Sequence, residues 1–336
     1  MLPKKKSKNR IVLNLVICFI LLALSALVIL FRQRIIDQIS VLQFEPTSEI
    51  LSLTNRLGLS SEGKFYFYAS HPELESAADF NQSCNQTNKI ENTTSVLGCF
   101  TSSRIYIYNV TDEKLNGIRE VTAAHEMLHA VYQRLDDSEK NKLTNLLEAE
   151  YKKLSSDANF ADLMAFYDKT EPGEKYNELF SVIGTTVADI DPLLESYYDK
   201  YFSDRQAIVN YNKAYNGVFK DLSDQATALS SQLDVLSKNI PTETAQYNAD
   251  VNTLNADIDL FNARAAAGDF GSLNQFYLER ANLESRVSAI NDTRASVNAD
   301  IDKYNSLLDK YNSIALESQQ LYNSIDSKLA EAESVE

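Results

Sequence analysis

The spacing of apolar residues divides the chain into three regions of different character. Residues 11–31 form an apolar run without a charged side chain. At ~1.5 Å per residue, a helix of this length crosses the ~30 Å hydrocarbon core of a bilayer. We therefore predict a transmembrane helix at 11–31, preceded by a cytoplasmic basic segment at 1–10. A cleaved signal peptide is the alternative, but no small-residue cleavage site follows the run.

The region between this run and residue 203 predicts a small sheet followed by helices. A juxtamembrane segment at 32–59 has a helical pattern that Pro46 interrupts. Two later stretches alternate in the manner of strands, 64–70 and 103–110. From about residue 115 the spacing becomes helical. The predicted helices are 116–135, 137–155, 159–168, 173–188 and 191–202. Together these elements predict an α+β domain over 60–203.

From residue 204 the apolar residues follow a heptad repeat, which predicts a long coiled coil. One seam runs from Ile208 to Leu236 and resumes from Tyr247 to Phe261, shifted by one position across Pro241. The other seam consists of two rows of positions spaced seven residues apart. The first row is 276, 283, 290, 297, 304, 311, 318 and 325. The second row is 280, 287, 294, 301, 308, 315, 322 and 329. Glycines separate the seams, so we predict an antiparallel hairpin over 204–336 with its tip near 265–272. An intermolecular coiled coil, with another chain or a second copy as partner, is the alternative.

Charge restricts both the partners and the orientation of the chain. The net charge is −15, so we do not expect binding to nucleic acid, whose phosphates require Lys and Arg for neutralisation. Residues 1–34 nevertheless contain seven Lys or Arg and no Asp or Glu. Five of these precede the apolar run and two follow it. This bias predicts a cytoplasmic N-terminus and an extracytoplasmic location for residues 35–336.

Two of the three cysteines fit an extracytoplasmic location. Cys84 and Cys99 flank a polar loop, and outside the cytosol we expect them to form a disulfide. Two free thiols would be expected if this part faced the cytosol. Cys18 lies within the apolar run, where we expect a small apolar filler.

The sequence HEMLH at 125–129 is the strongest chemical signal in the chain. On a helix, His125 and His129 lie one turn apart on one face, so both imidazoles can bind the same metal ion. Glu126 lies about 100° around the helix from His125, where it can lean over the open side of the ion. This arrangement is typical of zinc hydrolases in which the glutamate acts as general base. Two surface histidines on an ordinary helix are the alternative.

A catalytic zinc ion also needs a third protein ligand. Glu178, in YNELFSVIGTTV, is a better candidate than Glu174 or His71. HEMLH followed by a helix with N-E-x-x-S-x-x-G-T resembles the gluzincin clan of zinc metallopeptidases, the thermolysin-like arrangement, over about residues 60–203. The resemblance implies a zincin-like fold with Glu126 as general base. It also implies Zn²⁺ as cofactor, with three protein ligands: His125, His129 and Glu178.

The chain departs from the gluzincin pattern at Val182. The clan has an aspartate there that orients a ligand histidine through a hydrogen bond, so Asp189 or a backbone carbonyl is expected to take this role. The resemblance further implies a downstream side chain that stabilises the oxyanion, for which Tyr198 and Tyr201 are the candidates. The strand ending near Val110 is expected to pair with an extended peptide.

These inferences predict a membrane-anchored, extracytoplasmic zinc metalloprotease that cleaves protein or peptide substrates. The stretch 261–286 also resembles coiled-coil regions of bacterial membrane-anchored envelope proteins, which implies a bacterial envelope. The alternative is a structural or adaptor protein of the envelope, in which the coiled coil carries the function and the zinc domain is inactive. A zinc amidase acting on cell-wall material is a third hypothesis, because HExxH alone does not identify the bond that is cleaved.

Overall fold

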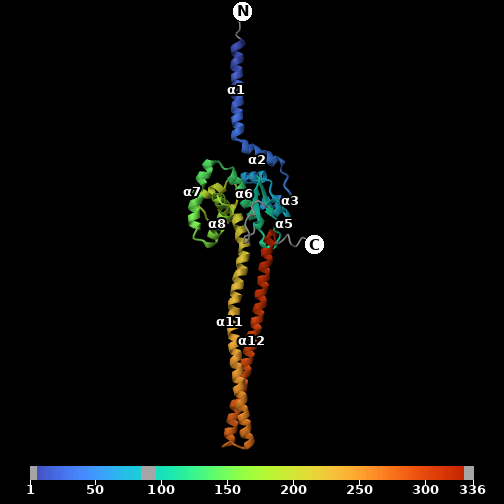
Figure 1. The fold of residues 1–336 in the computed structure, drawn as a ribbon, viewed down its shortest axis with the longest axis vertical. Helices are drawn as coiled ribbons and strands as arrows, with labels where there is room; N and C mark the ends of the chain where they lie inside the picture. The colour runs from blue at the N-terminus through green and yellow to red at the C-terminus, as the bar shows by residue number, and fades with distance from the viewer. Residues whose placement is uncertain (1–5, 85–95, 329–336) are drawn as a thin grey trace, which may run out of the picture. The chain divides into compact units, whose positions relative to one another are not determined.

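The computed structural model describes residues 6–84 and 96–328, which are mainly helical with one three-stranded sheet. The chain divides into two compact units (Figure 1). Residues 1–218 and 321–336 form one, called here the sheet unit, and 219–320 form the other, the hairpin unit. The expected combination of a small sheet with many helices is confirmed. Most of the polar loop between the two cysteines, and the first part of the basic segment, lie outside the described residues.

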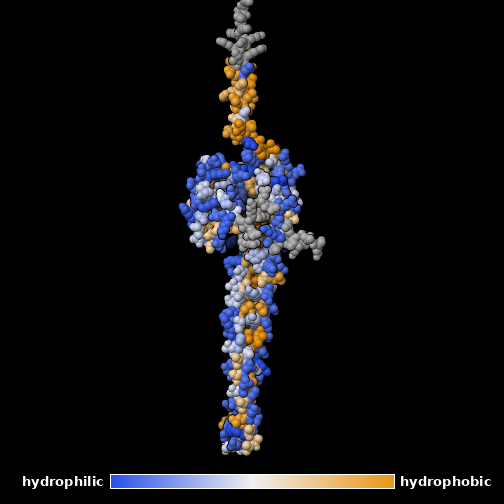
Figure 2. Space-filling view, in the orientation of Figure 1, coloured by the Kyte–Doolittle hydropathy of each residue, from blue (hydrophilic) through white to orange (hydrophobic). Residues whose placement is uncertain are grey.

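Helix α1 (Lys6–Leu30) contains the predicted membrane span. Among the described residues it is the one helix long and apolar enough to cross a bilayer, over Val12–Leu30. The side chains of this stretch are exposed, and Figure 2 shows hydrophobic surface along the helix. A helix that is apolar all round and not covered by protein is typical of a membrane span.

Three short helices follow, α2 (Arg32–Gln43), α3 (Ser48–Arg56) and α4 (Ser61–Ala69). The prediction of a strand at 64–70 is wrong, because these residues belong to α4 and its C-terminal cap. The Ser60 side chain accepts a hydrogen bond from the Gly63 N–H at 3.1 Å and so caps the helix. Phe and Tyr alternate at 65–68 without a charged residue, so their pattern fits a helix as well as a strand. The N-cap at Ser60 is the signal that favours the helix.

The sheet has the strand order β1-β3-β2. Strand β1 (Glu73–Glu75) is parallel to β3 (Arg104–Tyr108), and β2 (Gly98–Thr101) is antiparallel to it. β3 confirms the strand predicted at 103–110. It is the central strand, however, and both of its edges are already paired, so the prediction that this strand pairs with a peptide is wrong. Of the described strands, β1 and β2 are the two edge strands, and each pairs with β3.

Helix α6 (Ile118–Arg134) lies at the centre of the sheet unit, where α9, β2 and β3 pack against it. Most of its residues from 118 to 131 are buried. The other helices begin and end close to the predicted positions. They are α7 (Asp137–Leu154), α8 (Ala158–Thr170), α9 (Lys175–Thr186) and α10 (Pro192–Tyr198). Asp136, Asp157 and Asp191 cap α7, α8 and α10 by accepting hydrogen bonds from backbone N–H groups.

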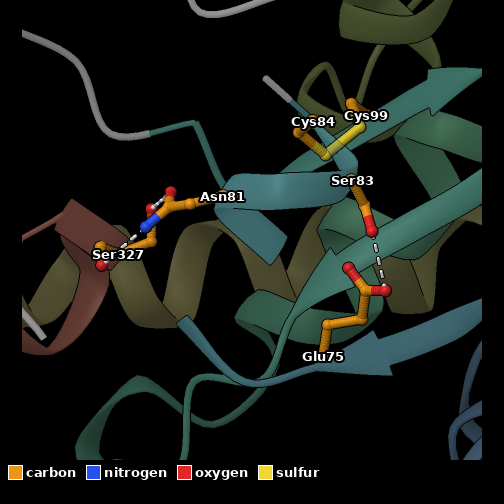
Figure 3. The surroundings of a disulfide bond; sticks show 6 residues. All are labelled: Glu75, Asn81, Ser83, Cys84, Cys99 and Ser327. Atoms are coloured by element: carbon orange, nitrogen blue, oxygen red, sulfur yellow. Dashed lines mark hydrogen bonds between the residues drawn. A yellow bond between two sulfur atoms is a disulfide. The ribbon is translucent and has the colours of Figure 1, made fainter. Parts of the chain in front are cut away.

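Helix α5 (Ala77–Ser83) is linked to strand β2 by a disulfide and to Ser327 by hydrogen bonds (Figure 3). Cys84, directly after α5, forms a disulfide with Cys99 in β2, which confirms the predicted bridge. Asn81 makes a reciprocal pair with Ser327. The Asn81 amide donates to the Ser327 carbonyl at 3.1 Å, and the Ser327 hydroxyl donates to Asn81 Oδ1 at 2.8 Å. The segment around Ser327 is thereby attached to α5, which the disulfide joins to β2.

Two long helices, α11 (Arg205–Ala267) and α12 (Leu273–Ile325), form a hairpin with its turn at 268–272, close to the predicted tip. Within the hairpin unit, Arg286 of α12 forms an ion pair with Asp257 of α11 at 2.7 Å. Near the turn, the rings of Phe261 and Phe276 lie 5.2 Å apart. Helix α11 continues through Pro241, so the shift in its seam occurs within one unbroken helix.

The structure also adjusts the predicted boundary at residue 204. The first turns of α11, up to Val218, belong to the sheet unit, because Ile208 is buried in its core and Tyr211 and Tyr215 pack against that core.

One of the two predicted rows in α12 is wrong. The row from 276 to 325 is buried or half-buried, as expected. In the other row, Val287, Ile301 and Tyr322 are 41%, 38% and 56% exposed. The less exposed positions lie one residue earlier, at 279, 286, 293, 300, 307, 314 and 321. Four of these are polar or charged, whereas the exposed row is richer in apolar residues, so counting apolar positions favoured the wrong row.

This difference is testable by comparing Leu254→Ala with Val287→Ala. Leu254 is 5% exposed, and truncating a buried leucine costs about 2–5 kcal/mol. Truncating the exposed Val287 should change stability by no more than ~0.5 kcal/mol. Hydrogen exchange of backbone amides at 245–265 should therefore accelerate in the first variant only. Equal acceleration in both would contradict the corrected seam.

Candidate metal centre

Helices α6 and α9 bring the three predicted ligands together. His125 and His129 lie one turn apart on α6, and Glu178 lies on α9. Gly184 allows α9 to pack closely against α6. A Cβ added at Gly184 of α9 would lie 2.5 Å from a Leu128 side-chain carbon of α6, so a larger residue would push the two helices apart.

The ligand atoms converge on one point. The Nε2 atoms of His125 and His129 lie 3.0 Å apart. Glu178 Oε1 lies 3.4 Å from His129 Nε2, and its Oε2 lies 3.7 Å from His125 Nε2. One atom of each side chain falls within 4.8 Å of the others, which is a spacing that a single metal ion can bridge.

The chemistry of this cluster fits a cation. Glu178 is 0% exposed, and neither of its carboxylate oxygens accepts a hydrogen bond from the described residues. Burying a carboxylate without a partner is costly, and a bound cation removes that cost. Burial lowers the pKa of His125 to about 4 and also lowers the pKa of His129. Both imidazoles are therefore neutral near pH 7, which is the form that binds metal.

A hydrogen bond from α9 orients one of the two histidines. His129 Nδ1 lies 2.9 Å from Asn177 Oδ1 and 3.3 Å from Ser181 Oγ. The Asn177 carbonyl oxygen can only accept, so Nδ1 carries the proton and the Nε2 lone pair faces Glu178. For His129, Asn177 thus takes the role that was expected of Asp189 or a backbone carbonyl, and Asp189 is exposed. Asn177 directly precedes Glu178 in the motif, so the sequence did contain this signal.

Glu126 lies beside the cluster without being part of it. It is 6% exposed, lines the adjoining pocket and accepts no hydrogen bond from the described residues. Burial, together with the charges of Glu178 and Glu171, raises the pKa of its carboxyl group well above the usual value. Strand β2 passes directly over it, since a Cβ added at Gly98 would lie 2.7 Å from Glu126 Oε1. A glycine at 98 therefore keeps room for the Glu126 carboxylate.

The prediction that Tyr198 or Tyr201 stabilises an oxyanion is wrong. Tyr198 is fully buried, stacks on Phe180, and donates its hydroxyl hydrogen bond to the Phe180 carbonyl at 2.7 Å. Tyr201 is buried beside Tyr66. Neither side chain is among the residues that line the pocket next to the cluster.

Tyr167 of α8, unlike these two tyrosines, lies next to the cluster. It lines the pocket, and its ring is stacked on that of His125 with the centroids 6.1 Å apart. Burial and the nearby carboxylates of Glu178 and Glu126 raise its pKa well above the usual value, so its hydroxyl remains a donor. The gluzincin resemblance implies a donor after the third ligand, whereas Tyr167 precedes Glu178 in the chain.

The two fallback ligands lie outside the cluster. His71 Nε2 lies 3.0 Å from the Ser40 carbonyl oxygen, and the His71 ring packs against Phe44. Glu174 precedes α9 and accepts a hydrogen bond from the Asn177 amide at 3.2 Å. Among the described residues, the group that could hold a metal ion consists of the three side chains that the motifs indicate.

The cluster opens into a pocket of about 970 Å³. One wall is the edge strand β2 with Val96 and Leu97, and another is formed by α8. Asn212 and Tyr215, near the start of α11, also line it. Glu171, at the end of α8, lies close to the ligands, and burial next to Glu178 raises its pKa to about 7. The pocket is large enough for several side chains of an extended peptide.

Substitution of Asn177 tests whether it orients His129. Asn177→Ala should weaken zinc binding by roughly 10–100-fold, as loss of a hydrogen-bonded partner of a ligand histidine does elsewhere. Asn177→Asp keeps an acceptor and should retain tight binding. Competition with a chromophoric chelator measures both affinities, with Asn159→Ala as a control that removes another pocket-lining amide. Unchanged affinity in Asn177→Ala would exclude the orienting role.

The centre therefore combines two neutral imidazoles, a buried carboxylate that lacks a hydrogen-bond partner, and a second glutamate beside them. No protein-family model matches the chain, and searches of curated proteins and of solved structures likewise find no match. The inference about the chemistry of the site therefore rests on its geometry.

Proposed function

We propose that this protein is a membrane-anchored metallopeptidase with its catalytic centre outside the membrane. The observation that carries the proposal is the convergence of His125, His129 and the partnerless buried carboxylate of Glu178, with Glu126 beside them at the wall of a pocket. Glu126 neither belongs to the metal-binding group nor has a hydrogen-bond partner among the described residues, and such a side chain is costly to bury. Its position beside the cluster therefore favours a role in the reaction.

Zinc is the metal that best suits this donor set. Two imidazoles and one carboxylate, with a fourth position left open, form a common catalytic zinc site. Zn²⁺ held by His125, His129 and Glu178 would act as a Lewis acid on a water molecule and on the scissile carbonyl. The ligand helix α6, the third ligand on α9 and an edge strand beside them support a zincin-like fold for the sheet unit.

The chain's own residues supply the proton transfers and the positioning. Glu126 accepts a proton from the attacking water and donates it to the leaving amine, and its raised pKa favours holding that proton between the two transfers. Tyr167 keeps its hydroxyl proton and can donate a hydrogen bond to the carbonyl oxygen as negative charge develops there. Both side chains line the same pocket.

The edge strand β2 offers a docking site for the substrate backbone. Tyr108 N–H donates to the Leu97 carbonyl, which fixes the alternation of hydrogen-bonded pairs between β2 and β3. By this alternation, Gly98 and Phe100 direct their backbone groups away from β3. An extended peptide can add to this edge as a further strand, next to Glu126.

Two features support an extracytoplasmic location. Helix α1 is suited to anchor the chain, and the basic residues precede it, which favours a cytoplasmic N-terminus. The Cys84–Cys99 disulfide favours an oxidising compartment for the sheet unit. A location outside the membrane, in a bacterial envelope, is consistent with both.

An adaptor function is the alternative, and the tip of the hairpin favours it. Four large apolar side chains are exposed near the turn: Leu260, Leu273, Tyr277 and Leu278. Exposed apolar residues of this kind are typical of surfaces that bind other proteins. In that case the metal centre would have a structural role, and the hairpin would carry the function.

Metal analysis and a proteolysis assay test the metallopeptidase proposal. The full chain, purified in detergent, should contain close to one zinc ion and cleave casein. Chelation should abolish cleavage, and added zinc should restore it. Full cleavage by metal-free protein, or a protein that neither contains nor takes up zinc, would overturn the proposal.

A further inference from the structure

The pocket next to the metal centre is lined by acidic side chains and, among the described residues, by no lysine or arginine. Its carboxylates are those of Glu126, Asp157, Glu171 and Asp189. We propose that the pocket selects substrates that carry a cationic group close to the scissile bond. This inference rests on the proposed peptidase function and specifies the class of substrate.

Two of the acids are exposed at the pocket, and they are called here the rim. Asp157 caps α8, where its carboxylate accepts a hydrogen bond from the Phe160 N–H at 3.1 Å, so the cap restrains its position. Asp189 lies in the connection after α9. Both side chains belong to exposed residues that line the pocket, so they can meet an incoming ligand.

Two of the basic residues close to the pocket in the chain already have partners. Arg205 is 3% exposed and donates to the Val187 carbonyl at 2.6 Å and to the Ala188 carbonyl at 3.0 Å. Its guanidinium also forms an ion pair with Glu195. Lys153, next to Leu154 of the pocket wall, forms an ion pair with Glu150 at 2.9 Å. These two charges are therefore not free to neutralise the acids of the pocket.

The apolar part of the pocket complements the acids. Aliphatic and aromatic side chains lie along the wall between α8 and the end of α9, namely Leu154, Phe160, Leu163, Val182 and Val187. A lysine or arginine side chain combines an apolar stem with a charged end, and such side chains pack the stem on apolar surface while the charge stays at a polar rim. This combination fits the pocket better than a purely aliphatic side chain.

A second observation points to a ligand within the pocket itself. Glu126 is more than nine-tenths buried, lines the pocket and accepts no hydrogen bond from the described residues. With Glu171 it places two further carboxyl groups in the pocket, next to the metal centre. A cation in the substrate can come either from a Lys or Arg side chain or from a free α-ammonium group, and both would be attracted by the same carboxylates.

The test uses fluorogenic peptides of one sequence, with Lys, Met or Glu at the residues flanking the scissile bond and with a free or acetylated N-terminus. The zinc-loaded full chain in detergent should give a kcat/KM about tenfold higher for Lys than for Met, and lowest for Glu. Asp157→Asn combined with Asp189→Asn should reduce the Lys preference several-fold. Asn caps helices as well as Asp does, so α8 should begin as before.

Asp162→Asn is the matched control, because it removes one exposed charge from α8 at a position that does not line the pocket. It should leave the Lys preference unchanged. Preference for free over acetylated N-termini, without Lys preference, would support the proposal with the α-ammonium as the cation. Equal cleavage of Lys, Met and Glu peptides in both N-terminal forms would overturn it while leaving the peptidase function intact. No cleavage of any peptide by zinc-loaded protein would instead refute the peptidase function.

Discussion

Glu126→Gln should lower the rate of peptide hydrolysis by a factor of about 10²–10⁴, the range typical of a lost general acid–base group. Glutamine has the shape of glutamate but cannot accept the proton of the attacking water. The zinc content should remain that of the unchanged chain, because Glu126 is not among the three side chains that converge on the metal position. Steady-state kcat with fluorogenic peptides, together with metal analysis of the same sample, measures both quantities.

The thermal stability of the Glu126→Gln variant provides an independent test of how Glu126 is buried. Burial and neighbouring carboxylates disfavour the ionised form of Glu126, as its raised pKa indicates. A neutral amide of the same size should therefore leave the unfolding temperature of the metal-free protein unchanged or raise it. Glu113→Gln, at an exposed position before α6, is the control for the loss of one acidic residue. Wild-type kcat in a zinc-loaded Glu126→Gln variant would exclude the base role and favour the adaptor alternative.

Glu178→Ala should remove metal binding almost completely. A first ligand contributes more than the 10–100-fold that a hydrogen-bonded neighbour of a ligand does, so zinc affinity should fall by more than about 100-fold. The substitution also separates metal binding from folding. In the unchanged chain, zinc at 100 times its Kd should stabilise the protein by ~2.7 kcal/mol, whereas the variant should gain almost nothing.

Thermal unfolding with and without added zinc measures this difference, and chelator competition gives the affinities. Glu148→Gln is the matched control, since Glu148 lies on α7 and pairs with Lys175 of α9 outside the centre. A Glu178→Ala variant that retains one zinc ion with unchanged affinity would remove Glu178 from the ligand set.

The residues that the sequence predicted well are those whose relations are local. His125 and His129 lie on the same face because a helix repeats every ~3.6 residues, and no tertiary information is needed. Glu178 was found through a second short motif on its own helix. The helix bounds followed from Asp caps such as Asp136, which act within one turn.

The errors arose where the outcome depends on tertiary packing. Tyr198 and Tyr167 are both tyrosines near the end of a helix, and only the packing of that helix decides which one reaches the pocket. Val287 and Arg286 are neighbours in α12, and the charged one faces the partner helix because Asp257 is there to pair with it. The residues at 64–70 follow a period that fits a strand and a helix alike.

The hydrogen bonds between Ser327 and Asn81 bear on how the length of the hairpin can change in evolution or design. The chain leaves the sheet unit after Val218 and re-enters it at Leu321, and the Asn81–Ser327 pair fastens the returning segment. The hairpin is thus an insertion whose two ends are both held by the same folded unit. Removing whole heptads equally from both arms would preserve the register of the remaining seams. Evolution or design can therefore vary the length of the hairpin without altering the sheet unit.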